Sequence, residues 1–435
     1  MMKNLLQKLI IYRNFSSDIP LYKIANIFSQ YNDKTIDKDT AIGLIYNEIY
    51  RIIDIGIKSK FSDNLWLSYI AYLLATSENP FTLSIERTGI IDDTLKSFAL
   101  NDCDIFIKLI NFEFSSIERE LGIDCFTMIK KYTTKNKNET PYDHNLSILI
   151  NELSNEIKDI KDTNALYEKL IEFYKKYGVG DFGLYKAFRL SPLKDGKLFI
   201  PISVTSNIKF TDLLGYDEQK QELVNNTEAF LNNQHANNVL LYGDAGTGKS
   251  SSIKSLLNMY YERGLRMIEV YKQDYQYLPE IMSILKNRNY HFILYFDDLS
   301  FEKNETEYKY LKAIIEGGLE VKPDNVLIYA TSNRTHLLHE TFSDRKEVET
   351  DDVHITDTLT EQTSLSLRFG LTIGYFCPKR QDFLDMIVEL ASRHKELSHI
   401  DKNELIEKAI YWNRYHPDMS GRSAQQFVDY LMTQM

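Results

Sequence analysis

Eight consecutive residues, 243–250, carry the strongest chemical signal in the sequence, GDAGTGKS. Glycines let this backbone turn tightly, so that successive N–H groups point into one concavity, and the start of a following helix adds partial positive charge. Lys249 can reach the β- and γ-phosphates of a nucleotide, and the Ser250 hydroxyl can ligate Mg²⁺. A chance match in a glycine-containing turn is the alternative, but an apolar run precedes the motif and a helix-like segment follows it. We therefore expect a phosphate-binding P-loop made of Gly243, Asp244, Ala245, Gly246, Thr247, Gly248, Lys249, Ser250 and Ser251.

Two further apolar runs end in polar residues. Residues 291–296 are followed by Asp297 and Asp298, and we expect their strand to lie next to the P-loop strand, with both acids facing the ligand crevice. Asp297 would then hold Mg²⁺ through water, together with Ser250, and Asp298 would polarise the attacking water. Asn333 follows the run 325–330 and could bond the γ-phosphate or the water. The alternative for these residues is a solvated turn after a buried strand.

The elements that must position these residues begin near Phe210, where apolar runs alternate with helical segments. This alternation predicts an α/β fold with a parallel sheet covered on both faces. The expected strands are 238–242, 266–271, 291–296, 325–330 and 372–376, and the expected helices are 218–231, 250–263, 278–288 and 307–317.

The rest of the chain reads mainly as helices. Apolar spacing predicts an all-helical region over about 1–130, whose many aromatic side chains we interpret as core and not as a base-stacking platform. Gly178, Gly180 and Gly183 form a glycine-rich loop, but no strand feeds it and no lysine closes it, so we predict a turn. Other expectations are a linker over 130–145, helices over 146–160 and 164–177, a short hairpin over 184–201 and a polar surface loop over 336–363.

Composition narrows the protein class. The chain has 435 residues, 43% of them hydrophobic, which predicts two or three globular domains. A formal net charge of −11 disfavours a broadly electropositive nucleic-acid surface. Its three cysteines have no paired or metal spacing, and no apolar stretch of about 20 residues exists, so we expect a cytoplasmic protein without a membrane partner.

Taken together, the residues from about 210 to 435 resemble the AAA+ ATPases, and within them the DUF815 family of bacterial ATP-binding proteins. The segments NNVLLYGDAGTGKSS, FDDLSFE, DNVLIYATSNR and SLRFG carry this resemblance. It implies ATP and Mg²⁺ as ligands and a P-loop core with a five-stranded parallel sheet and flanking helices. The expected domains are an N-terminal helical domain (1–200), the α/β core (201–380) and a C-terminal helical lid (381–435).

The resemblance also implies individual roles. Asp297 matches the Walker B metal acid and Asn333 matches sensor 1. Asp298 stands where most members have Glu, and this shorter arm moves the carboxylate by about one C–C bond. Glu302 could serve in its place, so the water-activating residue stays open between them.

One further segment and two arginines match the family's pattern. Leu214 and Gly215, with Leu213 before them, resemble the segment that packs against adenine. Arg368 matches the arginine finger that acts on the ATP of a neighbouring subunit, and Arg422 matches the lid arginine called sensor 2. Each arginine also has an alternative role without function in catalysis. Arg368 could form a salt bridge before a strand, and Arg422 could be an ordinary residue at the start of a helix.

The favoured hypothesis is an ATP hydrolase that works as a homo-oligomer and moves a macromolecular client, with a protein as the expected client. The alternative is a nucleotide-gated binding module with little or no hydrolysis, which the Asp298 departure supports. A remodeller of DNA is possible but not indicated by the charge, and a small-molecule kinase lacks a visible acceptor site.

Overall fold

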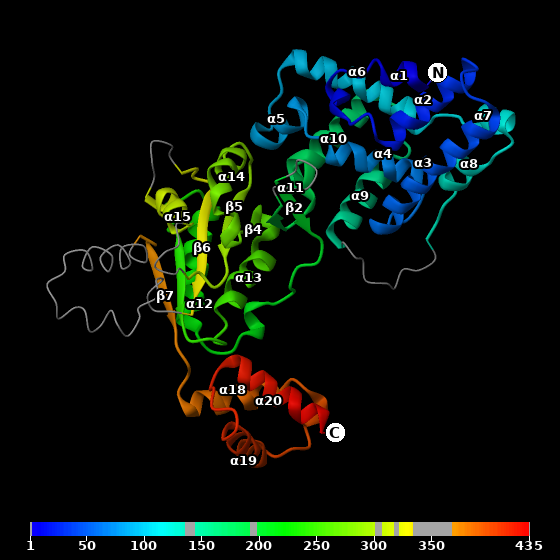
Figure 1. Ribbon diagram of the computed structural model, residues 1–435. Coiled ribbons are helices and arrows are strands. Elements are labelled where there is room, and N and C mark those ends of the chain that lie inside the picture. Colours follow the sequence, from blue (N-terminus) through cyan, green and yellow to red (C-terminus); the bar gives the residue numbers. More distant parts are fainter. Residues whose placement is uncertain are drawn as a thin grey trace. The chain divides into compact units, whose positions relative to one another are not determined.

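The computed structural model describes residues 2–134, 144–191, 198–300, 307–316, 322–333 and 368–434. The chain divides into two compact units, drawn in Figure 1. One unit contains Met1–Tyr185 and Pro201–Val204, and the other contains Lys186–Ile200 and Thr205–Met435. None of the described helices combines the length and the apolarity needed to cross a bilayer. The expected loop over 336–363 lies outside the described residues.

The first unit is helical, as expected. Its helix α4 (Leu65–Thr76) is apolar all round and buried on nearly every side, which places it at the centre of the core. Trp66, Phe81, Phe106 and Phe126 are fully buried, so the aromatic residues fill the core as predicted. The other helices are α1 (Met2–Leu6), α2 (Pro20–Asn32), α3 (Lys38–Lys58), α5 (Pro80–Thr88), α6 (Asp93–Ile110), α7 (Ser115–Leu121), α8 (Cys125–Lys130), α9 (His144–Ile157), α10 (Thr163–Tyr177) and α11 (Gly180–Leu184).

The glycine-rich loop at residues 178–183 is not the simple turn that we predicted, because its second half forms helix α11. Glu86 Oε2 accepts a hydrogen bond from Val179 N at 3.0 Å. A Cβ at Gly180 would overlap the carboxylate of Glu78. Carboxylates of the chain itself therefore lie against this loop, which is consistent with rejecting it as a phosphate cradle.

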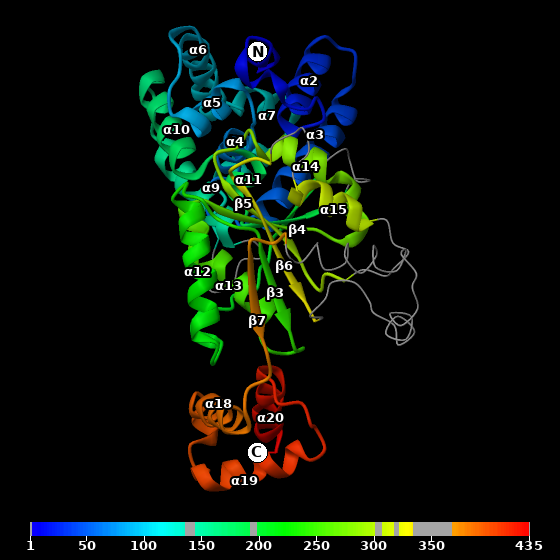
Figure 2. The same ribbon diagram turned by 90° about the vertical axis from the view of Figure 1, so that its left-hand side faces the viewer.

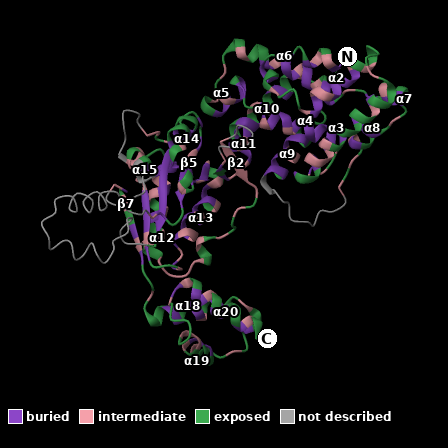
Figure 3. Ribbon diagram, viewed as in Figure 1, coloured by how far each residue is buried: buried purple, intermediate pink, exposed green. Residues whose placement is uncertain are grey.

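The second unit is built on a sheet in the order β2-β1-β4-β5-β6-β3-β7, and Figure 2 labels β3 to β7. The recorded pairings, from β1 to β7, are all parallel. This confirms the α/β class with a parallel sheet, and the central strands are buried, as Figure 3 shows. The strands are β1 (Ala187–Leu190), β2 (Phe199–Ile202), β3 (Val239–Gly243), β4 (Leu265–Glu269), β5 (His291–Phe296), β6 (Val326–Ser332) and β7 (Leu371–Tyr375).

Two expectations about the sheet were wrong. The sheet has seven strands and not five, because β1 pairs with β4 in parallel, with Ala187 opposite Met267, and β2 follows at the edge. Strand β5, which precedes the two acids, is not the neighbour of the P-loop strand β3, because β6 lies between them. The two extra strands, β1 and β2, lie in and at the end of the segment 184–201 that we predicted as a hairpin, and the pairing of β1 with β4 joins them to the sheet.

Helices follow the strands as predicted. They are α12 (Asp217–Leu231), α13 (Lys249–Tyr260), α14 (Leu278–Leu285) and α15 (Glu307–Glu316). After β7 come three more, which enclose a core of their own around Phe383, Ile387 and Phe427. These last helices, called the lid below, are α18 (Arg380–Ser392), α19 (Lys402–Asn413) and α20 (Gly421–Thr433).

Candidate functional site

The P-loop connects the end of β3 to the start of α13. Gly243 has φ +125°, and a Cβ there would lie 2.1 Å from the Tyr375 carbonyl oxygen on β7, so only glycine fits. Gly248, with φ +94°, is the residue before the first turn of α13. The N–H groups of that first turn have no partner within the helix and carry the positive end of its dipole. The loop therefore has the backbone expected of an anion site.

Lys249 lies beneath this loop and is only 5% exposed. Its Nζ donates to the carbonyl oxygens of Gly243 at 2.9 Å and of Asp244 at 2.5 Å, and so joins the two ends of the loop. Burial lowers the pKa of Lys249, and the nearby Arg422 lowers it further, while Asp244 and Asp298 oppose the shift. An anion at this position would relieve the cost of holding two cations together.

Ser250 and Asp297 form the pair predicted for the metal. Ser250 Oγ donates to Asp297 Oδ1 at 2.7 Å, and Thr331 Oγ1 on β6 donates to the same oxygen at 2.8 Å. Burial alone would raise the pKa of Asp297, but these hydrogen bonds outweigh it and keep the pKa below its usual value. The intervening strand β6 thus holds the acid in place through Thr331, a residue that our sequence reasoning missed.

Asp298 and Asn333 also meet. Asn333 Nδ2 donates to Asp298 Oδ1 at 2.8 Å, and both side chains are exposed. Asp298 has a left-handed backbone, with φ +52°, and its N–H donates to Thr331 Oγ1 at 2.9 Å. The two predicted water-positioning residues therefore form one pair at the carboxyl ends of β5 and β6. Glu302, the other candidate for the base, lies outside the described residues.

A cavity of about 710 Å³ opens in front of these residues, large enough for a nucleotide. P-loop residues from Ala245 to Ser252 line one part of it, with Asp297, Asp298 and Asn333. Apolar side chains line another part: Ile208, Leu213, Leu214, Met386 and Leu390. Leu214, which we expect to pack against adenine, is therefore a lining residue. Gly215, with φ +71°, is not among the lining residues, and a Cβ there would lie 2.7 Å from Met386 Cε.

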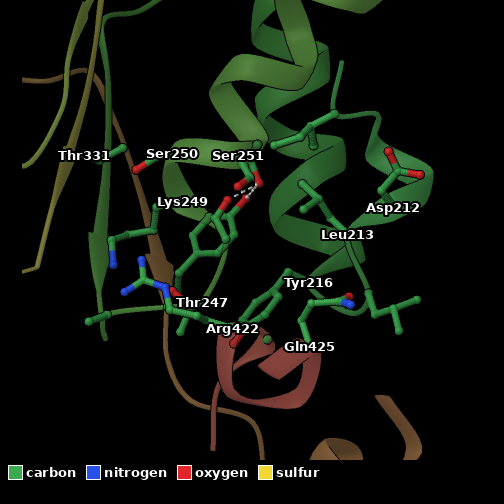
Figure 4. Close-up of a pocket in the computed structure, with 18 of the residues that line it drawn as sticks. Asp212, Leu213, Tyr216, Thr247, Lys249, Ser250, Ser251, Thr331, Arg422 and Gln425 are labelled. Atoms are coloured by element: carbon green, nitrogen blue, oxygen red, sulfur yellow. Dashed lines mark hydrogen bonds between the residues drawn. The ribbon is translucent and has the colours of Figure 1, made fainter. Parts of the chain in front are cut away.

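Tyr216 is a lining residue that the sequence did not reveal. Its ring stacks on that of Tyr375, with centroids 5.0 Å apart, and its hydroxyl donates to the Phe376 carbonyl oxygen at 2.6 Å. Figure 4 shows Tyr216 on the same side of the pocket as Leu213 and Gln425. The one feature of the sequence that could have indicated Tyr216 is its place directly after the Leu-Leu-Gly segment 213–215.

Arg422 brings the lid to the P-loop. Its backbone N–H donates to the Gly246 carbonyl oxygen at 3.1 Å, and a Cβ on Gly246 would lie 2.6 Å from Ser420 Oγ. In Figure 4 the side chains of Arg422 and Lys249 point toward one another. The start of α20 therefore rests directly on the loop, with its arginine directed into the pocket.

Arg368, like Gly215, is not among the residues that line this pocket. It lies three residues before β7, whereas the P-loop meets the opposite end of that strand at Tyr375. A five-residue strand spans about 17 Å. Arg368 therefore lies near the amino end of β7, whereas the P-loop lies at its carboxyl end.

The side chains present fit a magnesium nucleotide. A buried lysine and a lid arginine converge beside the P-loop, and a hydroxyl and a carboxylate offer the hard oxygen ligands that Mg²⁺ prefers. Among the described residues no group of three or more His, Cys, Asp or Glu side chains could hold a metal. Mg²⁺ in a nucleotide site needs only one or two protein oxygens, because phosphates and water complete its shell.

Comparison with known proteins places the chain in a family. Similar solved structures include the RuvB Holliday junction branch migration motor of Thermotoga maritima and two point variants of it, with 16% identity and TM-scores of 0.33 to 0.34. These alignments cover 51% of this chain and 63% of the motor, so nothing that the motor binds is transferred to this chain. No curated protein matches the sequence. The model of a family described as "Protein of unknown function (DUF815)" matches residues 184–435, more than half of the chain, and this protein belongs to the DUF815 family.

Proposed function

We propose that this protein is a Mg²⁺-dependent ATPase of the AAA+ type, which binds ATP between its sheet and its lid and uses hydrolysis to move a protein client. One observation carries the proposal. Lys249, the Ser250–Asp297 pair, the Asp298–Asn333 pair and Arg422 all line one cavity of about 710 Å³. A P-loop match alone would not require the other four residues, Asp297, Asp298, Asn333 and Arg422, to converge on it.

Each residue has a role in binding. The P-loop N–H groups and Lys249 would hold the β- and γ-phosphates, and Arg422 would contact the γ-phosphate from the lid. Ser250 and Asp297 would hold Mg²⁺, which when bound neutralises charge on the phosphate oxygens. The apolar part of the cavity, with Leu214 and Tyr216, would take the base.

Asp298 and Asn333 would act on the water. The water oxygen bonds to the γ-phosphorus as the bond to the β–γ bridging oxygen breaks, and Asp298 accepts the proton that the water loses. Asn333 would orient the water or the γ-phosphate. Because Asn333 binds Asp298 Oδ1, the other carboxylate oxygen is the one that would face the water.

The lid would transmit the reaction. The start of α20 rests on Gly246, so a change in the phosphates held by the loop acts directly on the lid. Arg368 is too far from its own pocket to serve it, which supports a homo-oligomer in which the arginine reaches a neighbouring subunit's ATP.

The test is phosphate release from ATP as a function of protein concentration, for wild type and Lys249→Ala. We expect specific activity to rise with concentration in wild type and to be absent in the variant. Equal rates in both proteins would refute the proposal.

A second candidate function, a nucleotide-gated binding module with negligible hydrolysis, has one observation in its favour. Asp298 has a short arm, and one of its two oxygens already accepts a hydrogen bond from Asn333 and is not available to the water. Tight ATP binding without turnover, even at high protein concentration, would favour this function. The net charge of −11 disfavours a DNA client. Binding to DNA in an electrophoretic shift assay, weakening as salt is added, would support one.

A further inference from the structure

A lysine that belongs to no P-loop motif lies beside the proposed metal pair. Lys254 is four residues after Ser250, so both side chains project from the same face of α13. Its Nζ lies 3.8 Å from Asp297 Oδ2, and 5.6 Å from the centre of the Tyr295 ring. The Lys254 side chain is 38% exposed, so packing alone does not explain this position.

The two oxygens of Asp297 have different neighbours. Oδ1 accepts hydrogen bonds from Ser250 and Thr331, whereas Oδ2 faces the ammonium of Lys254. The carboxylate is therefore restrained on both sides, by α13 and by β6. The neighbouring Tyr295 side chain is 1% exposed, whereas the Asp297 side chain is 41% exposed. The buried ring lowers the dielectric on one side of the carboxylate, and solvent screens the other side.

We propose that Lys254 is a positioning residue that orients Asp297 and supplies a permanent positive charge, which sets how strongly ATP binding depends on Mg²⁺. This inference rests on the proposed function. A fixed cation attracts metal-free ATP, which carries its full negative charge, and repels Mg²⁺ arriving at the same carboxylate. Removing the Lys254 charge should therefore weaken the binding of metal-free ATP and strengthen the binding of Mg²⁺ at Asp297.

The experiment measures the nucleotide dissociation constant by calorimetry in EDTA and again in excess Mg²⁺. The value in EDTA is then divided by the value in Mg²⁺. A non-hydrolysable ATP analogue is used in both titrations, so by linkage the ratio reports the coupling between metal and nucleotide without turnover. Lys254→Met should weaken binding in EDTA and raise the ratio about three- to tenfold, the effect of one unit charge at this range. Lys254→Gln gives the same test if the Met variant folds poorly.

Two variants control for other causes. Lys254→Arg keeps the charge and should leave the ratio within about twofold of wild type. Lys408→Met removes one charge from α19, where Lys408 pairs with Glu404 at 2.7 Å, and should also leave it unchanged. A Lys254→Met ratio equal to wild type overturns this inference alone. A wild-type protein that binds no ATP in either condition overturns the proposed function, and this inference with it.

Discussion

Asn333 Nδ2 and Asp298 Oδ1 lie 2.8 Å apart, so an amide that follows β6 and a carboxylate that follows β5 form one hydrogen-bonded pair. We expect Asp298→Asn to bind ATP within about threefold of wild type, because Lys249 and the Ser250–Asp297 pair are untouched. Its turnover should fall at least about 100-fold, since an amide cannot take a proton from water. Calorimetry and phosphate release measure the two quantities.

Glu302→Gln is the matched variant, because it removes the other carboxylate that the sequence offers for this role. It should keep most of the turnover. Loss of turnover in Glu302→Gln, with activity retained in Asp298→Asn, would assign the water-activating role to Glu302.

Gly246 allows the lid to approach the P-loop, and its replacement tests that contact. Its φ is +78°, and a Cβ would lie 2.6 Å from Ser420 Oγ. We expect Gly246→Ala to weaken ATP binding at least tenfold, with about 1–2 kcal/mol of backbone strain. Gly264→Ala is the control, because Gly264 has φ +90° but nothing within 4 Å of an added Cβ. Gly264→Ala should lose stability without losing ATP affinity. If Gly246→Ala and Gly264→Ala bind ATP equally well, the lid contact at Gly246 does not matter for binding.

Much of the site was predictable, because most of its residues belong to short sequence motifs. Buried parallel strands read as continuous apolar runs, which located β3, β5 and β6, and the fixed spacing of the P-loop placed Lys249 and Ser250. Thr331 could not be found in this way. Its contact with Asp297 depends on β6 lying between β3 and β5, and strand order is a property of the whole sheet.

The missed parts of the fold have a similar cause. The hairpin predicted over 184–201 contains β1, but a four-residue strand with the exposed Arg189 gives no sign of which strand lies beside it. Its parallel pairing with β4 is a property of the folded sheet. Tyr216 lines the pocket only because its left-handed backbone, with φ +57°, turns the ring onto Tyr375. Such tertiary effects override local sequence preference.

Lys322 predicts a pH dependence of stability. Burial lowers its pKa to about 8, and its Nζ donates to Asn238 Oδ1 at 3.1 Å. The unfolded chain, with an ordinary lysine pKa near 10.4, binds more protons between about pH 8 and 10.5, so stability rises with pH across that window. Between pH 8 and 10 wild type should gain about 2 kcal/mol relative to Lys322→Met in urea unfolding. Parallel pH profiles for the two proteins would contradict this assignment.

Arg368 predicts complementation between subunits. Arg368→Ala should bind ATP normally but lose at least about 100-fold in turnover, as expected for an arginine that acts on a neighbour's phosphates. Mixing it with Asp298→Asn should restore part of the activity, because Asp298→Asn subunits supply the arginine and Arg368→Ala subunits supply an intact pocket. Phosphate release from the mixture and from each variant alone provides the comparison. If the mixture shows no more activity than the sum of its parts, Arg368 does not act between subunits.

The most direct measurement is a calorimetric titration of Mg·ATP into wild type and Lys249→Ala under the same conditions. Lys249 is buried beneath the P-loop and joins its two ends, so its charge is held at the place where the phosphates would bind. We predict saturable binding by wild type and at least about 100-fold weaker binding by the variant, the loss expected for a buried charge that pairs with phosphate. No binding by wild type, or equal affinity in both proteins, would contradict the nucleotide site itself.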